Sequence, residues 1–391
     1  MPPIATRRTV RSTLVRGLLA ASALAVMTSA PHAQTSDRYT LSGSSLGPVA
    51  IYDLAGKVTV VRGTGTDVVV TVKRGGRDAA KLRVETGRLN GRESLRVIFP
   101  GRRIIYPALG RGSNTETHID ENGTFGGISW SLFSGSNSVR ISGSGSGLEA
   151  WADLEIAIPP RQATEVFLAA GDINATGTDS KLRLDTHSGD VHARGLTGDV
   201  TIDTGSGDVD VRDSSGDMLI DTGSGNVVVV KQKGERLSID TGSGDVKLMG
   251  AQVSTLKVDT GSGDVSLGAV SADDVLADTG SGSVMLDMVT DAESVVLDTG
   301  SGEVTLGLPR EFGAEYDIST GSGGIDIEVT HRSSVSERDE ARGRIGDGRG
   351  RLRVDTGSGS VQIRPRASSS SSSSVGSWGS GTFFGRSLPF E

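Results

Sequence analysis

Short stretches of alternating apolar and polar residues flank a repeated pentapeptide, Asp-Thr-Gly-Ser-Gly. Apolar residues occupy the positions three and one before the aspartate, as Leu237 and Ile239 do before Asp240. The alternation resumes after the pentapeptide, as in Val246 and Leu248. A period of two places the apolar side chains on one face of a strand. Each repeat therefore predicts two half-buried strands joined by a turn.

The pentapeptide recurs at a nearly constant spacing through the second half of the chain. Successive copies lie 18 to 21 residues apart between positions 185 and 319, and a gap of 36 residues precedes the last copy. The copies begin at Asp203, Asp221, Asp240, Asp259, Asp278, Asp298 and Asp355, with variants at Asp185 and Ser319. Two short strands cannot bury an apolar face alone, whereas stacked repeats bury a continuous core. The predicted fold is all-β, a single-stack parallel β-solenoid (β-helix-like) of about 18–21 residues per coil.

The same alternation assigns faces to the residues of the turn. The threonine shares the inward parity of the apolar residues, and the aspartate before it faces outward. The glycines supply positive φ and close backbone approach, which cost little only for glycine. The pentapeptide is therefore predicted to be a structural corner.

The regions before and within the regular repeats have their own patterns. Residues 39–100 are predicted to be a β-rich start of the repeat domain, with a degenerate copy of the turn at 54–58. Residues 101–147 are rich in glycine and serine and are predicted to be an insertion loop. Residues 148–366 hold the solenoid repeats, with a charged insertion at 331–350 that accounts for the long gap.

The two ends of the chain differ from the repeats. Residues 1–33 combine a basic start with a short apolar run, which is typical of a signal peptide. Residues 367–391 include seven consecutive serines and are predicted to be a disordered tail. No later segment is apolar enough to span a bilayer as a helix. We expect an exported protein of the periplasm, the outer surface or the medium, with no integral membrane span after signal removal.

Composition and charge narrow the chemistry. The chain has no cysteine, which excludes disulfides, Cys-ligated metal sites and thiol catalysis. The formal net charge of −8 is uneven, because residues 185–308 hold 22 acidic and 7 basic residues, or −15, which leaves +7 elsewhere. Phosphate binding needs clustered Lys and Arg, so nucleic acid is not an expected partner.

Stacked coils would align the acidic residues in two rows, with neighbours about 4.8 Å apart. The first row is Asp203, Asp221, Asp240, Asp259, Asp278 and Asp298; the second is Asp190, Asp208, Asn226, Asp245, Asp264 and Glu303, interrupted by Ser283. We expect each carboxylate to accept backbone N–H bonds inside its own turn, as in Asx-turns. Weak binding of Ca2+ is an open alternative, although the nine-residue Gly-rich repeat of calcium-binding β-rolls is absent.

No catalytic, cofactor-binding or metal-ligating residue is assigned from the sequence. Asp-Thr-Gly-Ser is also the active-site string of aspartic proteases, in which two carboxylates share a proton. Seven copies of the pentapeptide about 19 residues apart favour the turn interpretation instead. His187 and His192 flank one turn, and because the next coil has no matching pair we interpret them as solvated surface residues. We therefore expect that the protein is not an enzyme.

The residues resemble a known family. The run Leu-Ala-Gly-Lys-Val-Thr-Val at 54–60, the strand end Ile-Ala-Ile-Pro at 156–159 and the coils of the form Leu-x-Val-Asp-Thr-Gly-Ser-Gly-Asp-Val carry the likeness. They resemble the bacterial "putative adhesin" family of β-strand repeat domains, a domain of unknown function. The resemblance covers about residues 39–364 and implies a repeat fold without family catalytic residues.

The sequence therefore predicts an exported, noncatalytic, adhesin-like β-solenoid. Its repetitive acidic face would bind carbohydrate, an envelope polymer or a protein. Two alternatives stay open: a polysaccharide-active β-helix enzyme, and a structural or regulatory protein of the cell envelope. Neither a unique polar cluster nor a break in the repeat favours the enzyme.

Overall fold

The structure is a computed structural model that describes residues 36–43, 47–126 and 137–366. The chain divides into two units, Met1–Gln34 and Thr35–Glu391, and all described residues belong to the second. In the described ranges, no helix is long and apolar enough to cross a membrane.

Three segments singled out in the sequence lie wholly or partly outside the described residues. These are the predicted signal peptide at 1–33, the predicted tail at 367–391 and the stretch 127–136 of the predicted insertion loop. The repeat domain itself is described almost throughout.

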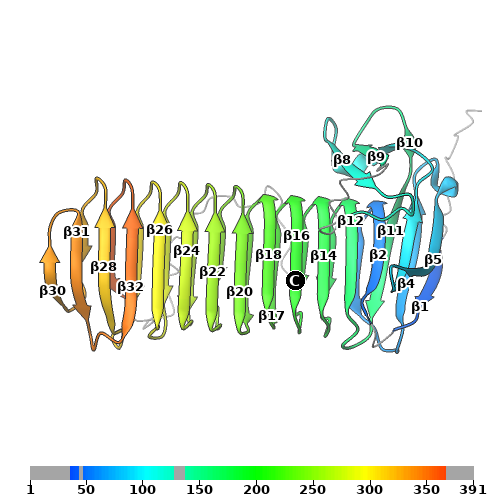
Figure 1. Ribbon diagram of the computed structural model, residues 1–391. Helices are drawn as coiled ribbons and strands as arrows, with labels where there is room; N and C mark the ends of the chain where they lie inside the picture. The colour runs from blue at the N-terminus through cyan, green and yellow to red at the C-terminus, as the bar shows by residue number, and fades with distance from the viewer. Residues whose placement is uncertain (1–35, 44–46, 127–136, 367–391) are drawn as a thin grey trace, which may run out of the picture. The chain divides into compact units, whose positions relative to one another are not determined.

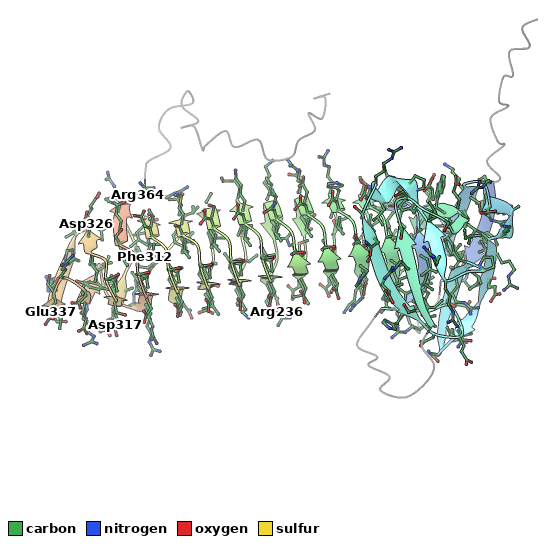
Figure 2. The ribbon with its side chains drawn as sticks, turned by 90° about the horizontal axis from the view of Figure 1, so that it is seen from above. Arg236, Phe312, Asp317, Asp326, Glu337 and Arg364 are labelled. Carbon is green, nitrogen blue, oxygen red and sulfur yellow. The ribbon has the colours of Figure 1, made fainter. Side chains whose placement is uncertain are left out.

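Two long sheets, here called sheet A and sheet B, make up most of the second unit (Figures 1 and 2). Sheet A has 14 strands, in the spatial order β1 (Ser36–Leu41), β4 (Val68–Gly75), β11 (Trp151–Ile158), β3 (Val58–Arg62), β13 (Ile173–Thr176), β15 (Val191–Arg194), β17 (Val209–Ser215), β19 (Val227–Lys233), β21 (Val246–Met249), β23 (Val265–Val270), β25 (Val284–Met288), β27 (Val304–Leu308), β33 (Val361–Pro365) and β29 (Ile325–Ile327). Sheet B has 15 strands, in the order β5 (Arg83–Leu89), β6 (Arg92–Ile98), β2 (Val49–Ala55), β12 (Thr164–Ala170), β14 (Leu182–Ser188), β16 (Val200–Ser206), β18 (Met218–Ser224), β20 (Arg236–Thr241), β22 (Thr255–Thr260), β24 (Asp274–Thr279), β26 (Ser294–Thr299), β32 (Gly350–Thr356), β28 (Ala314–Thr320), β31 (Glu340–Ile345) and β30 (His331–Ser336).

Each coil crosses from sheet B to sheet A through one pentapeptide turn. In the coil of Asp240, β20 ends at Thr241 and β21 begins at Val246. β20 pairs in parallel with β18 and β22, at equivalent positions one coil away. The inward residues of both sheets, such as Ile239 and Leu248, join one hydrophobic core. The predicted parallel β-solenoid is confirmed.

The threonine of the turn faces the core, as its parity predicts. Thr260 is only 1% exposed, and its hydroxyl donates a hydrogen bond to the Gly244 carbonyl of the preceding coil at 3.1 Å. The equivalent bond recurs at Thr186, Thr204, Thr222, Thr241, Thr279, Thr299, Thr320 and Thr356. A buried hydroxyl needs such a partner. This inward column of threonines therefore ties each coil to its neighbour.

The last glycine of the turn is required by the stacking. Gly244 has φ +150°, and a Cβ atom there would lie 2.1 Å from the Gly225 carbonyl oxygen of the preceding coil. That distance is far below any van der Waals contact, and the obstacle is backbone. Only glycine lets successive turns approach this closely.

The predicted degenerate copy of the turn forms the first coil. β2 and β3 flank Gly56, and they pair with β12 and β13, which precede the regular repeats. Residues 63–163, which separate these two coils in the sequence, include β6 and β11, which pair in parallel with β2 and β3 and extend both sheets beyond the first coil. Antiparallel pairings, β5 with β6 and β1 and β11 with β4, complete this end of the two sheets.

The predicted insertion loop at 101–147 differs from the expectation, because it contains strands. Together with the next residues it forms a four-stranded sheet, here called sheet C, in the order β10 (Leu148–Glu149), β7 (Arg103–Ile105), β9 (Asn137–Ser142) and β8 (Asn114–Ile119). Short 3₁₀ helices lie at η1 (Ala79–Lys81), before this segment, and at η2 (Pro107–Leu109), within it. The sequence did not indicate these strands because each has at most two buried apolar residues, such as Ile104 in β7 and Val139 and Ile141 in β9, in a segment rich in glycine and serine.

The last coils do not stack in sequence order. β32 lies between β26 and β28, and β33 lies between β27 and β29, so the coil at 350–365 is inserted into the stack. The predicted charged insertion at 331–350 is mostly the antiparallel strands β30 and β31, and β31 pairs with β28. The gap of 36 residues therefore encloses a hairpin that covers the end of sheet B (Figure 1).

Candidate binding surface

The outer face of sheet B carries a row of aspartates, here called the strand row. Strand pairing places each aspartate beside its equivalent in the next coil, so Asp240 lies between Asp221 and Asp259. Asp355 lies beside Asp298 because β32 is inserted next to β26. The strand row consists of Asp185, Asp203, Asp221, Asp240, Asp259, Asp278, Asp298 and Asp355. The row predicted from the sequence is thus present and is longer by one residue at each end.

Few cations accompany the strand row. They are Arg183 beside Asp185 and Asp203 (2.9 and 3.1 Å), Lys257 beside Asp259 (3.8 Å) and Arg353 beside Asp355 (3.9 Å). Four members have no ion pair in the described part of the chain: Asp221, Asp240, Asp278 and Asp298. Like charges directly opposite on neighbouring strands are unfavourable.

The electrostatics of the strand row follow from this arrangement. Burial raises the pKa of Asp240 above its ordinary range, and the neighbouring Asp259 and Asp221 raise it further. Burial, followed by aspartate neighbours, also raises the pKa of Asp203, Asp221 and Asp278. A raised carboxyl pKa means that the charged form is disfavoured. A cation placed on this face would relieve the repulsion.

The second predicted row, here called the turn row, has a structural role. The Asp245 carboxylate accepts a hydrogen bond from the backbone N–H of Asp264 in the next coil, at 2.9 Å. In the equivalent bonds, at 2.8–3.2 Å, a backbone N–H donates to the side-chain oxygen of the corresponding residue in the preceding coil. The donor and acceptor residues are Asp190 and Asp172, Asp208 and Asp190, Asn226 and Asp208, Asp245 and Asn226, and Ser283 and Asp264. The turn row therefore joins successive coils.

The expectation that these carboxylates cap their own turns is wrong. The N–H groups that flank the turn already bond to carbonyls of the next coil, as Gly244 does to Ser262 and Val246 does to Asp264. Because the coils stack in register, the backbone N–H of Asp264 in the next coil lies within hydrogen-bond distance of the Asp245 carboxylate. Hydrogen bonding inside the turn is replaced by hydrogen bonding between turns.

An aromatic cluster marks one end of the strand row. Phe167 lies beside Asp185 on the neighbouring strand, and its ring stacks on Tyr52 with centroids 4.7 Å apart. Phe125, which follows β8, packs edge-on against Tyr52 at 5.9 Å. These rings cover the outer face of the first coils, so the strand row begins at Asp185.

The histidines and the acidic rows show no arrangement for a metal. His187 and His192 are exposed, and they lie on strands of different sheets, β14 and β15. Across residues 36–43, 47–126 and 137–366, no group of three or more His, Cys, Asp or Glu side chains is placed to hold a metal ion.

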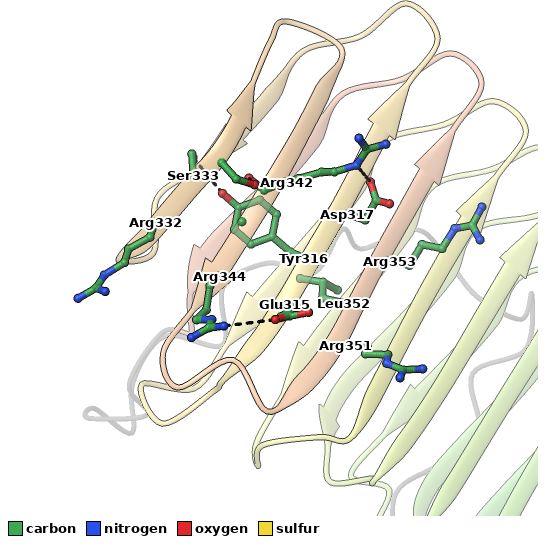
Figure 3. Close-up of a pocket in the computed structure, with 12 residues that line it drawn as sticks. Glu315, Tyr316, Asp317, Arg332, Ser333, Arg342, Arg344, Arg351, Leu352 and Arg353 are labelled. Atoms are coloured by element: carbon green, nitrogen blue, oxygen red, sulfur yellow. Dashed lines mark hydrogen bonds and ion pairs between the residues drawn. The ribbon is translucent and has the colours of Figure 1, made fainter.

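A second feature of sheet B was missed in the sequence. A hollow at the far end of the same face is lined by five arginines, Arg332, Arg342, Arg344, Arg351 and Arg353 (Figure 3). Arginines at alternate positions, 342 with 344 and 351 with 353, put their side chains on one face of a strand and could have indicated it.

Comparison with known proteins agrees with the repeat architecture. Residues 197–364 match the family model described as Toastrack DUF4097. The match confirms the resemblance to a β-strand repeat family of unknown function. The coils before residue 197 pair in the same register as those that the match covers. No curated protein matches the chain.

One solved structure is similar to the chain. It is described as a putative cell adhesion protein from Clostridium sporogenes, with 11% sequence identity and a TM-score of 0.22. The similarity covers 85% of this chain and 100% of that one. At this identity and TM-score the likeness supports no conclusion about function.

Proposed function

We propose that the protein is an exported, noncatalytic, adhesin-like scaffold whose strand row binds a cationic partner of the cell surface or envelope. The contrast between the two rows of carboxylates carries this proposal. The turn row is used in hydrogen bonds between coils. The strand row faces outward, and half of its members have no cationic partner in the described residues.

The spacing of the strand row indicates the shape of the partner. Eight carboxylates at a strand spacing of about 4.8 Å extend over about 34 Å. Each exposed ion pair contributes only about 0.2–1 kcal/mol, so useful affinity requires several pairs at once. A partner that carries cations in an extended array fits this requirement, as a polymer of amino sugars or a lysine-rich segment does.

Repetition also favours binding over catalysis. Every coil presents nearly the same groups, whereas a catalytic site needs a unique set of side chains in fixed geometry. The proposed role of the protein is therefore binding without catalysis. Cleavage of a glycan by the purified protein, abolished by one point substitution, would overturn this part of it.

The binding proposal is tested with a variant of the four strand-row residues that have no ion pair. Asp221, Asp240, Asp278 and Asp298 are changed together to Asn, and binding of oligolysine and of chitosan oligomers is measured by titration calorimetry in EGTA. We expect an affinity loss of at least about tenfold, because four exposed ion pairs are removed. Binding of the unchanged protein should weaken as salt is added.

A charge-matched control separates the strand row from bulk charge. The control changes four exposed acidic residues of the connections between coils to their amides: Glu235, Asp273, Glu293 and Glu311. Their side chains form no hydrogen bond or ion pair in the described part of the chain. Equal loss of binding in both variants would show nonspecific attraction to an acidic protein and would refute the proposal.

A further inference from the structure

In the first coil, an aspartate takes the position of the inward threonine. Strand pairing places Asp53 beside Leu168 of the second coil, and Leu168 beside Thr186 of the third. The Asp53 side chain is only 1% exposed. A buried carboxylate is costly unless it is paired, so this replacement of a neutral hydroxyl by an acid requires a physical account.

The acceptor that the threonines use has a counterpart in the first coil. Thr186 donates its hydroxyl hydrogen to the carbonyl of Gly171, the last turn glycine of the preceding coil. The first coil has β11 before it in sheet A instead of another turn. A Cβ atom on Gly56 would overlap the Ala152 carbonyl oxygen of β11, in the way that one on Gly189 would overlap the Gly171 oxygen. The Ala152 carbonyl therefore stands where a preceding turn would present its own.

The Asp53 carboxyl is a neighbour of this carbonyl. The same Cβ position on Gly56 is 3.0 Å from Asp53 Oδ2, so one point lies close to both oxygens. Neither carboxyl oxygen of Asp53 forms a hydrogen bond with a described residue. An ionised carboxylate can only accept hydrogen bonds, and a carbonyl cannot donate one. A protonated carboxyl carries an O–H, and protonation thus gives Asp53 the bond that the threonines make.

The surroundings of Asp53 favour its protonated form. Burial raises the pKa of the Asp53 carboxyl well above its ordinary value, and the charge of Asp153 on β11 raises it further. Two backbone N–H groups of the turn lower this pKa, but burial outweighs them. The other titratable groups around the site are Tyr106, after β7, and Asp172, before β13. These neighbours are acidic groups, so none of them stabilises a negative charge on Asp53.

We propose that Asp53 is a proton-dependent latch, which in its protonated form donates a hydrogen bond to the Ala152 carbonyl and holds the start of β11 on the first coil. The pairing of β11 with β3 begins at Leu154, two residues beyond Ala152, where the chain returns from sheet C. Loss of the proton places a buried charge beside a carbonyl oxygen and Asp153. The start of β11 then loosens, whereas the regular coils keep their threonine hydroxyls.

The direction of the pH dependence follows from where the proton binds more tightly. The pKa of Asp53 is higher in the folded protein than in the unfolded chain. The latch therefore contributes its full stability below the ordinary aspartate range, and the contribution is lost as the pH rises through the folded pKa. Acid tightens this end of the stack and alkali loosens it. The device involves no residue of the strand row, so it is independent of the proposed cation binding.

The test replaces Asp53 by the residue of the regular coils. The hydroxyl of Asp53→Thr donates at every pH, and Asp53→Val has the same shape without a donor. Amide hydrogen exchange is followed by mass spectrometry at pH 6 and pH 9, with correction for the intrinsic pH dependence of exchange. Between these pH values, ordinary carboxylates stay ionised. In the unchanged protein, protection of residues 152–154 should fall at least about tenfold on going to pH 9, and in Asp53→Thr less than about twofold.

Two controls locate the effect. Peptides from β21 in the same digest report on the distant coils, and their protection should be the same in Asp53→Thr and the unchanged protein at each pH. Thr186→Val removes the equivalent donor from a regular coil, and it should weaken protection of that coil equally at both pH values. A fall in Asp53→Thr as large as in the unchanged protein would overturn the proposal.

Two further results bear on the proton itself. An infrared band of a protonated carboxyl should be present in the unchanged protein at pH 6 and absent from Asp53→Asn; no difference between the two spectra would contradict the latch. Protection of residues 152–154 in Asp53→Val that equals that of the unchanged protein at pH 6 would do the same. If Asp53→Val does not fold, Asp53→Thr and Asp53→Asn decide the test, because both keep a donor.

Discussion

Two aspartates five residues apart are expected to affect stability in opposite ways. Asp240 belongs to the strand row and stands between Asp221 and Asp259. Two unit charges about 4.8 Å apart repel by about 0.9 kcal/mol in water, and physiological salt screens this by about half. Asp240→Asn removes two such repulsions, so we expect it to stabilise the fold by about 1 kcal/mol at pH 7.

Asp245 belongs to the turn row and shows the reverse behaviour. Its carboxylate accepts the Asp264 N–H, and Asp245→Ala leaves that donor without its partner. The expected cost is about 1 kcal/mol. Asp245→Asn should change stability by less than about 0.5 kcal/mol, because the amide oxygen of Asn226 already accepts the equivalent bond one coil earlier.

The measurement is urea unfolding followed by circular dichroism, at pH 7 and at pH 4, in 0.15 M and about 1 M salt. The pKa of Asp240 is raised in the fold, so the folded protein gains stability as the pH falls through that pKa toward the unfolded value. The advantage of Asp240→Asn should therefore be smaller at pH 4 than at pH 7, and it should shrink in 1 M salt. If Asp240→Asn destabilises the protein at pH 7, the assignment of uncompensated repulsion to the strand row is refuted.

Three more predictions follow from the core and the turns. Gly244→Ala should lower the free energy of unfolding by more than about 3 kcal/mol, because a strained φ and a backbone clash combine. Gly195→Ala should lower it by only about 1–2 kcal/mol, because Gly195 has φ +62° but no atom lies within 4 Å of a Cβ placed there. Equal urea midpoints for the two variants would contradict the stacking argument. Thr260→Val should cost about 1 kcal/mol in the same assay, since the hydroxyl bond to Gly244 is lost. Burial raises the pKa of Asp53 well above its usual range, so Asp53→Asn should be more stable than the unchanged protein at pH 8. This difference in unfolding free energy should narrow as the pH falls toward 4. A difference that widens on acidification would show that the Asp53 carboxyl is charged in the folded protein.

The sequence predicted what each coil does by itself. The alternation around Asp240, the inward threonine and the need for glycine are local properties, and they recur often enough to fix the strands and the turn. The strand row could also be predicted, because identical repeats stacked in parallel place identical residues side by side.

Relations between coils could not be predicted in the same way. The Asp245 side chain has N–H groups within its own turn and in the next one, and only the three-dimensional stack decides between them. The order of the last coils is equally hidden, because the pentapeptide at Asp355 fits beside any other copy. The arginine-lined hollow depends on that order, so sequence reasoning could not assemble it.

The inserted last coil has a mechanical consequence. Solenoids usually fray from their ends, one coil at a time, because each coil contacts only its neighbours. Here the last described segment, 350–365, is held between β26 and β28 on one sheet and between β27 and β29 on the other. A pull on the chain beyond residue 366 would therefore load an interior coil, which must shear past two neighbours before it can be released. Tension from that side would be resisted by hydrogen bonds on both edges of the coil at once.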